Sequence, residues 1–98
     1  MEAKYPYKIV RTQNAGVFAG YLITKEKRDV VLIVARRLWR WSGAASLSQL
    51  SVDGVKHPED CKFPAPVLRV HLFEVIEILD VTPEAQKSIE EVTIWQSE

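Results

Sequence analysis

Three short apolar segments separated by brief polar breaks constrain the fold of this chain most strongly. Residues 7–12, 17–24 and 30–35 are each long enough for one strand, and the breaks at 13–16 and 25–29 are rich in turn-forming or charged residues. Such brief connections join antiparallel neighbours, because a parallel crossover needs a dozen or more residues. The run at 30–35 has no polar alternation, which predicts a strand buried on both faces.

The second half of the chain predicts two short helices. Ser46 and Gln49 have the spacing of a capping box, so a helix is expected over residues 47–53. Thr82 as N-cap, with Pro83 at the first helical position, predicts the start of a second helix.

Further strands are expected on either side of the second helix. Residues 67–81 alternate in polarity but are interrupted by carboxylates, which predicts two short strands or one strand with a bulge near Glu74. Residues 92–95 predict a final edge strand, and Gly20 inside the second strand predicts a bend or a close backbone approach. We therefore predict a single domain over residues 1–98 of mainly β (α+β) class, a small bent antiparallel sheet or barrel with two short helices.

Charge and composition exclude several classes of protein. Thirteen basic residues balance thirteen acidic ones, whereas binding of long nucleic acid favours a strongly basic surface. The single cysteine, Cys61, forms no intrachain disulfide, so we expect an intracellular protein. The run at 30–35 is far too short to cross a membrane, and no membrane partner is expected.

No residue pattern predicts catalysis, a metal or a cofactor. His57 and His71 have no metal-ligand spacing with Cys61. Glu74 and Glu77 stand three residues apart, which places them on opposite faces of a strand and is poor geometry for an acid/base pair. We therefore expect no enzyme activity.

A run of arginine and tryptophan is the main candidate for a binding site. If the third strand continues through residue 41, alternation directs Arg37, Trp39 and Trp41 to one face and Arg36, Leu38 and Arg40 to the other. The arginine fork of donors suits phosphate, and tryptophan stacks on planar groups such as bases.

The segment after this run adds features that favour an anionic ligand. The helix expected to begin after Ser46 offers free backbone N–H groups, and the small residues at 42–45, including Gly43, let a ligand approach the backbone. We predict a small phosphorylated, planar ligand bound by Arg36, Arg37, Trp39, Arg40, Trp41, Ser46 and Ser48.

Two alternatives for the arginine and tryptophan residues stay open. The tryptophans are also suited to the core, with the arginines paired to Glu74, Glu77 or the Glu90-Glu91 pair. Arginine and tryptophan are equally enriched at the centres of protein–protein interfaces, so the same run predicts an oligomer or partner surface.

The run from Ala35 to Leu50, with Gly54-Val55-Lys56, Cys61-Lys62-Phe63 and residues 75–79, resembles a family of short bacteriophage-encoded proteins, mostly without assigned function. The resemblance extends from about Tyr7 to Trp95. The family in turn resembles phage anti-CBASS sponge proteins, which sequester cyclic nucleotide signals of a bacterial defence system without cleaving them.

The resemblance implies a homo-oligomer, a dimer or tetramer, that acts in the host bacterial cytoplasm with its sites at subunit interfaces. It implies stacking and phosphate contacts from Arg36, Arg37, Trp39 and Trp41, and further polar contacts from Ser46 and Ser48.

Overall fold

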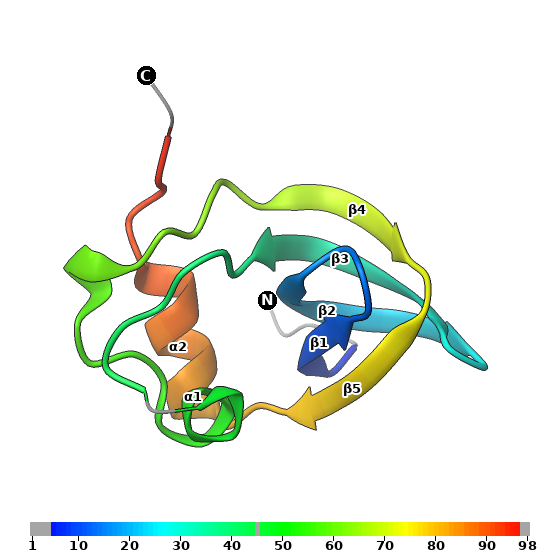
Figure 1. Ribbon diagram of the computed structural model, residues 1–98, viewed down its shortest axis with the longest axis horizontal. Helices are drawn as coiled ribbons and strands as arrows, with labels where there is room; N and C mark the ends of the chain where they lie inside the picture. The colour runs from blue at the N-terminus through cyan, green and yellow to red at the C-terminus, as the bar shows by residue number, and fades with distance from the viewer. Residues whose placement is uncertain (1–4, 45, 97–98) are drawn as a thin grey trace.

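The computed structural model describes residues 5–44 and 46–96, which form a five-stranded antiparallel sheet and two short helices (Figure 1). The strands are β1 (Tyr7–Thr12), β2 (Val17–Glu26), β3 (Asp29–Arg37), β4 (Val67–Leu72) and β5 (Val75–Asp80). Their order in the sheet is β4-β3-β2-β1-β5. The predicted mainly β, α+β class and the bent antiparallel sheet are therefore confirmed.

The sheet is strongly curved because its two edge strands follow each other in the chain. Only Phe73 and Glu74 separate β4 from β5, and Glu74 has a φ of 56°. Two backbone hydrogen bonds hold this link against the β1–β2 and β2–β3 turns, from Gln13 N to the Glu74 oxygen at 3.1 Å and from Val75 N to the Arg28 oxygen at 2.9 Å. Figure 1 shows β4 and β5 wrapping around the other three strands. Of the two arrangements expected for residues 67–81, the structure has two strands, and they lie at opposite edges of an open sheet.

Hydrophobic side chains form a core on each face of the sheet. The first lies inside the curve and draws on all five strands, through Val10, Phe18, Val30, Leu32, Ala35, Leu72 and Val75. The second lies between the sheet and the helical layer and contains Tyr7, Ile9, Ala19, Leu38, Leu50, Cys61, Phe63, Ile89 and Val92. Within β3, Val30, Leu32 and Ala35 belong to the first core and Val31 is also buried, whereas Val34 is 43 % exposed. The burial on both faces that was predicted for residues 30–35 is therefore found only in the first half of the run.

Both helices begin at the expected residues. α1 (Leu47–Asp53) is capped by Ser46, whose Oγ accepts a hydrogen bond from Gln49 N at 3.1 Å. α2 (Pro83–Glu91) is capped by Thr82 in the same way. A single 3-10 turn, Pro58–Asp60, lies between α1 and β4. No helix in the described part of the chain is long and apolar enough to cross a membrane.

A bulge in β3 decides which way the following side chains point. Ile33 pairs with Tyr21 and Arg36 with Ala19, so Val34 is an extra residue in β3, and its φ is 49°. The bulge lies beside Gly20, where an added Cβ would come within 2.9 Å of the Ala35 Cα. The close backbone approach predicted at Gly20 is confirmed.

Two expected strand segments are shorter than predicted. β3 ends at Arg37 and does not continue through residue 41, because β2 begins at Val17 and offers no further partner. Beyond it, Arg40 forms one isolated bridge with Lys62. The edge strand expected at residues 92–95 is reduced to one bridge, between Phe63 and Ile94.

Candidate functional site

Arg36 is buried, and its guanidinium is hydrogen-bonded to backbone carbonyl groups of the protein. Its side chain donates to the carbonyl oxygens of Phe63 (Nη2, 2.9 Å), Pro64 (Nε, 3.0 Å) and Ile89 (Nη1, 2.9 Å), with a longer contact to the Glu90 carbonyl oxygen. Two of these acceptors, Ile89 and Glu90, belong to the last turn of α2, where cations are favoured by the helix dipole. Arg36 is only 4 % exposed and therefore has little surface to offer a ligand.

Arg37 has the opposite environment although it is the next residue. Its guanidinium lies 4.3 Å from the centroid of the Phe18 ring, and Nη1 donates to the Ala15 carbonyl oxygen at 2.6 Å. The turn that carries Ala15 is held by Thr12, whose Oγ1 accepts from Ala15 N and donates to the Gly16 carbonyl oxygen. Arg37 remains exposed, so its fork is fixed in direction while part of it faces solvent.

A hollow of about 570 Å³ opens beside Arg37. It lies between the β1–β2 turn and the segment after β3, and its lining residues are Asn14, Ala15, Gly16, Val17, Arg37, Leu38, Trp39 and Trp41. We call it the Arg37 hollow. Trp39 is 62 % exposed, whereas Trp41 is partly buried against the second core, between the sheet and the helical layer. Three of the predicted site residues, Arg37, Trp39 and Trp41, are thus brought together.

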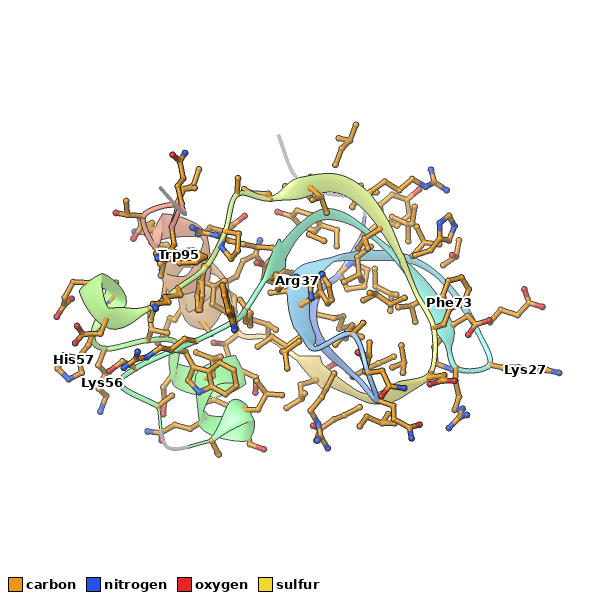
Figure 2. All side chains as sticks on the ribbon, turned by 45° about the horizontal axis from the view of Figure 1, so that its top comes forward. Lys27, Arg37, Lys56, His57, Phe73 and Trp95 are labelled. Carbon is orange, nitrogen blue, oxygen red and sulfur yellow. The ribbon has the colours of Figure 1, made fainter. Side chains whose placement is uncertain are left out.

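The C-terminal segment adds two residues that the sequence reasoning missed. The Trp95 ring packs edge-to-face on Trp39, with centroids 4.9 Å apart and an interplanar angle of 80°. The Lys62 ammonium lies 5.3 Å from the centroid of the Trp95 ring, a cation–π contact. Figure 2 shows Trp95 on the side of the molecule that carries the helices, far from Lys27. No local pattern links these residues to Trp39, although the Cys61-Lys62-Phe63 and Trp95 positions already belonged to the resemblance.

Backbone pairing places Lys62 and Trp95 beside the arginine and tryptophan run. Arg40 and Lys62 exchange two backbone hydrogen bonds, of 3.3 and 2.7 Å. Trp95 N donates to the Phe63 carbonyl oxygen at 3.0 Å, next to the bridge between Phe63 and Ile94. Residues 40, 62–63 and 94–95 are therefore adjacent in space, although none of them belongs to a regular strand.

Three cations of this region have no carboxylate partner within the part of the chain that the structure describes. The ion pairs there are Lys8–Asp80, Arg11–Glu77 and His57–Glu59, so none includes Arg37, Arg40 or Lys62. Glu74 instead accepts a hydrogen bond from Asn14. The alternative in which the arginines pair with acidic side chains is not realised, since Arg36 meets Glu90 through its backbone oxygen. Arg37, Arg40 and Lys62 are therefore held by contacts other than ion pairs among the described residues.

Ser46 and Ser48 lie outside the Arg37 hollow. The Ser46 hydroxyl caps α1, and Ser48 is exposed on the same helix. Gly43 was expected to leave room for a ligand, but an added Cβ there would come within 2.5 Å of Lys56 N, so the chain itself occupies that space. Ala45, in the same connection, lies outside the described residues.

The groups considered for catalysis or metal binding are not assembled in one place. Burial raises the pKa of the Cys61 thiol, which is opposite to the change that activates a nucleophilic cysteine. No group of three or more His, Cys, Asp or Glu side chains within residues 5–44 and 46–96 is placed to hold a metal ion.

Comparison with known proteins gives one match, to a family model described as a domain of unknown function, DUF6948, over residues 6–89. No curated protein and no solved structure matches the chain. The matched range includes the whole sheet, both helices' N-termini and the Arg37 hollow, whereas Trp95 lies beyond it. Because the match covers most of the sequence, the chain belongs to the DUF6948 family.

Proposed function

We propose that this protein is a non-catalytic binding module whose Arg37 hollow takes a small phosphorylated, planar ligand of the nucleotide class. The observation that carries the proposal is the pairing of a held, partly exposed guanidinium at Arg37 with an exposed indole at Trp39 on one hollow. Arg37 supplies donors for a phosphate, and Trp39 supplies a rigid surface for a base, with stacking worth roughly 1–3 kcal/mol per base.

Electrostatics supports a small ligand over long nucleic acid. The net charge of zero favours no extended basic surface, and Arg37 lines the hollow without an ion pair to any described carboxylate. One or two phosphates match this local charge, whereas a polyanion needs many contacts.

The resemblance to phage anti-CBASS sponge proteins supports a more specific role. In this proposal the protein binds a cyclic nucleotide defence signal in the host bacterial cytoplasm and holds it without converting it. The Arg37 hollow is open to solvent, and a second copy of the chain in a homo-oligomer supplies its remaining wall. The ligand is then enclosed at a subunit boundary.

Isothermal titration calorimetry against a panel of cyclic di- and trinucleotides tests the proposal. We expect at least one panel member to bind and to be recovered unaltered, by mass spectrometry, after heat release. Arg37→Ala and Trp39→Ala should each weaken that binding about tenfold or more, since each removes a contact worth about 1.4 kcal/mol. The matched control is Lys27→Gln, which removes a cation at the far end of the β2–β3 hairpin (Figure 2).

Two outcomes would contradict the proposal. If no panel member binds, the cyclic nucleotide assignment is wrong. If Arg37→Ala and Trp39→Ala both unfold the protein, these side chains are structural, and thermal unfolding of each variant distinguishes this case from a loss of affinity.

One observation favours a second candidate, a module that inhibits a host protein by docking on the same surface. Trp39 is 62 % exposed, and arginine and tryptophan dominate many protein–protein hot spots. The two candidates differ in what the purified protein retains. A ligand binder carries a small molecule after purification from infected cells, whereas an inhibitor retains a stoichiometric host protein.

A further inference from the structure

Trp39 is linked to two separate cationic positions. It lines the Arg37 hollow, where the Arg37 guanidinium is held against Phe18. It also contacts Trp95, and the Lys62 ammonium lies over the ring of Trp95. Lys62 and Trp95 do not line the hollow, so the second cation belongs to a different part of the surface.

The position of Lys62 is set by the fold. Its backbone is bonded to Arg40 in both directions, which ties it to the residue that follows Trp39. Its side chain is partly buried and lies over Trp95, yet no carboxylate among the described residues neutralises it. A lysine held on an indole loses less conformational freedom on meeting a phosphate than a lysine free in solvent does.

We propose that Lys62 is a second anion contact, so that the site selects ligands with two phosphate groups, one bound near Arg37 and one near Lys62, with a base stacked on Trp39. This inference rests on the proposed function, and it names the ligand class more narrowly as a dinucleotide. Trp95 is a positioning residue in it, because it orients both Trp39 and Lys62.

Two linear dinucleotides that differ by one phosphate test the inference. The probes are pApA, which has a terminal phosphate and a phosphodiester, and ApA, which has the phosphodiester alone. We expect the wild type to bind pApA about tenfold more tightly than ApA, the gain of one charge-assisted contact. This preference should decrease as salt is raised, because salt screens an exposed cation.

Lys62→Gln should remove the preference for pApA and leave the affinity for ApA within about twofold of the wild type. Lys62→Arg should keep the preference, since it keeps the charge. Lys27→Gln is again the control, and it should change neither affinity. Unchanged ApA binding also reports that the Lys62 variant is folded.

The outcomes separate this inference from the proposed function. A preference for pApA that persists in Lys62→Gln overturns the role of Lys62, as does an equal loss of both affinities. Failure of the wild type to bind either linear dinucleotide overturns the inference while binding of the cyclic panel still supports the proposed function. Failure of the cyclic panel as well overturns both.

Discussion

Arg36 and Arg37 are adjacent in the chain and have opposite environments. Arg36 lies in a closed region, where its guanidinium joins the segment of Phe63 and Pro64 to the end of α2. Arg37 lies in an open region, where it stacks on Phe18 and lines the Arg37 hollow. One arginine therefore joins the sheet to the helical layer, and the other remains exposed.

The difference shows that residue type alone does not mark a binding arginine. Alternation along β3 directs the two side chains to opposite faces of the sheet. What each face meets is then decided by distant parts of the chain, which are α2 for Arg36 and the β1–β2 turn for Arg37. Arg36 is buried and bonded to the protein itself, so the proposed site contains Arg37 and not Arg36.

The largest loss of stability is expected from removing the Arg36 guanidinium from the closed region. Arg36→Met should lower the free energy of unfolding by about 3 kcal/mol or more, because it removes three charge-assisted hydrogen bonds, to the carbonyl groups of Phe63, Pro64 and Ile89. Arg37→Met is the matched variant and should cost about 1 kcal/mol or less, since its one hydrogen bond is exposed. Urea denaturation of both variants measures the difference. Equal losses would mean that the two arginines do not differ in structural role.

A smaller loss of stability is expected from a substitution beside the β3 bulge, which precedes Arg36 and Arg37. Gly20→Ala should cost about 1–3 kcal/mol, because the added Cβ would meet the Ala35 Cα at 2.9 Å and force β2 and β3 apart. The same strain should disturb the direction of Arg36, so amide hydrogen exchange should increase at the end of α2. Unchanged stability in urea, with unchanged exchange, would show that the two strands are not in close contact at Gly20.

The smallest effect is expected in α1, where substitutions test whether this helix belongs to the ligand site. Ser46→Ala should cost about 1 kcal/mol of stability through loss of the α1 N-cap. It should leave ligand affinity unchanged, because Ser46 lies outside the Arg37 hollow. Ser48→Ala is the matched variant on the same helix and should change neither quantity by a measurable amount. A fall in affinity for either variant would extend the site to α1, as the resemblance implies.

Local signals predicted most of the secondary structure. The bounds of β1 and α1, the caps at Ser46 and Thr82, and the close approach at Gly20 agree with expectation. These features depend on residues within a few positions of each other, so one sequence carries the information. The ends of β3 and of the chain were predicted less well, because a strand continues only as far as its partner does.

The candidate site was predicted only in part, because local patterns do not report contacts between distant parts of the chain. The run at residues 36–41 marked the region, but only Arg37, Trp39 and Trp41 of it line the hollow. Lys62 and Trp95 reach the site through contacts that span more than twenty residues of sequence, and no spacing rule detects such a contact. Alternation placed Arg36 and Arg37 on opposite faces, but no local pattern indicated which of the two faces is buried.

The sequence by itself determined where strands and helices begin, that neighbouring strands are antiparallel, and where arginine and tryptophan concentrate. Turn residues, caps and apolar periodicity act over a few residues, which is why these properties are local. The tertiary structure alone decided that β4 and β5 lie at opposite edges of one curved sheet. It also decided that Arg36 is buried while Arg37 is open. The physical reason is that burial depends on which distant elements pack together, and a buried guanidinium is stable only where the folded chain supplies its acceptors.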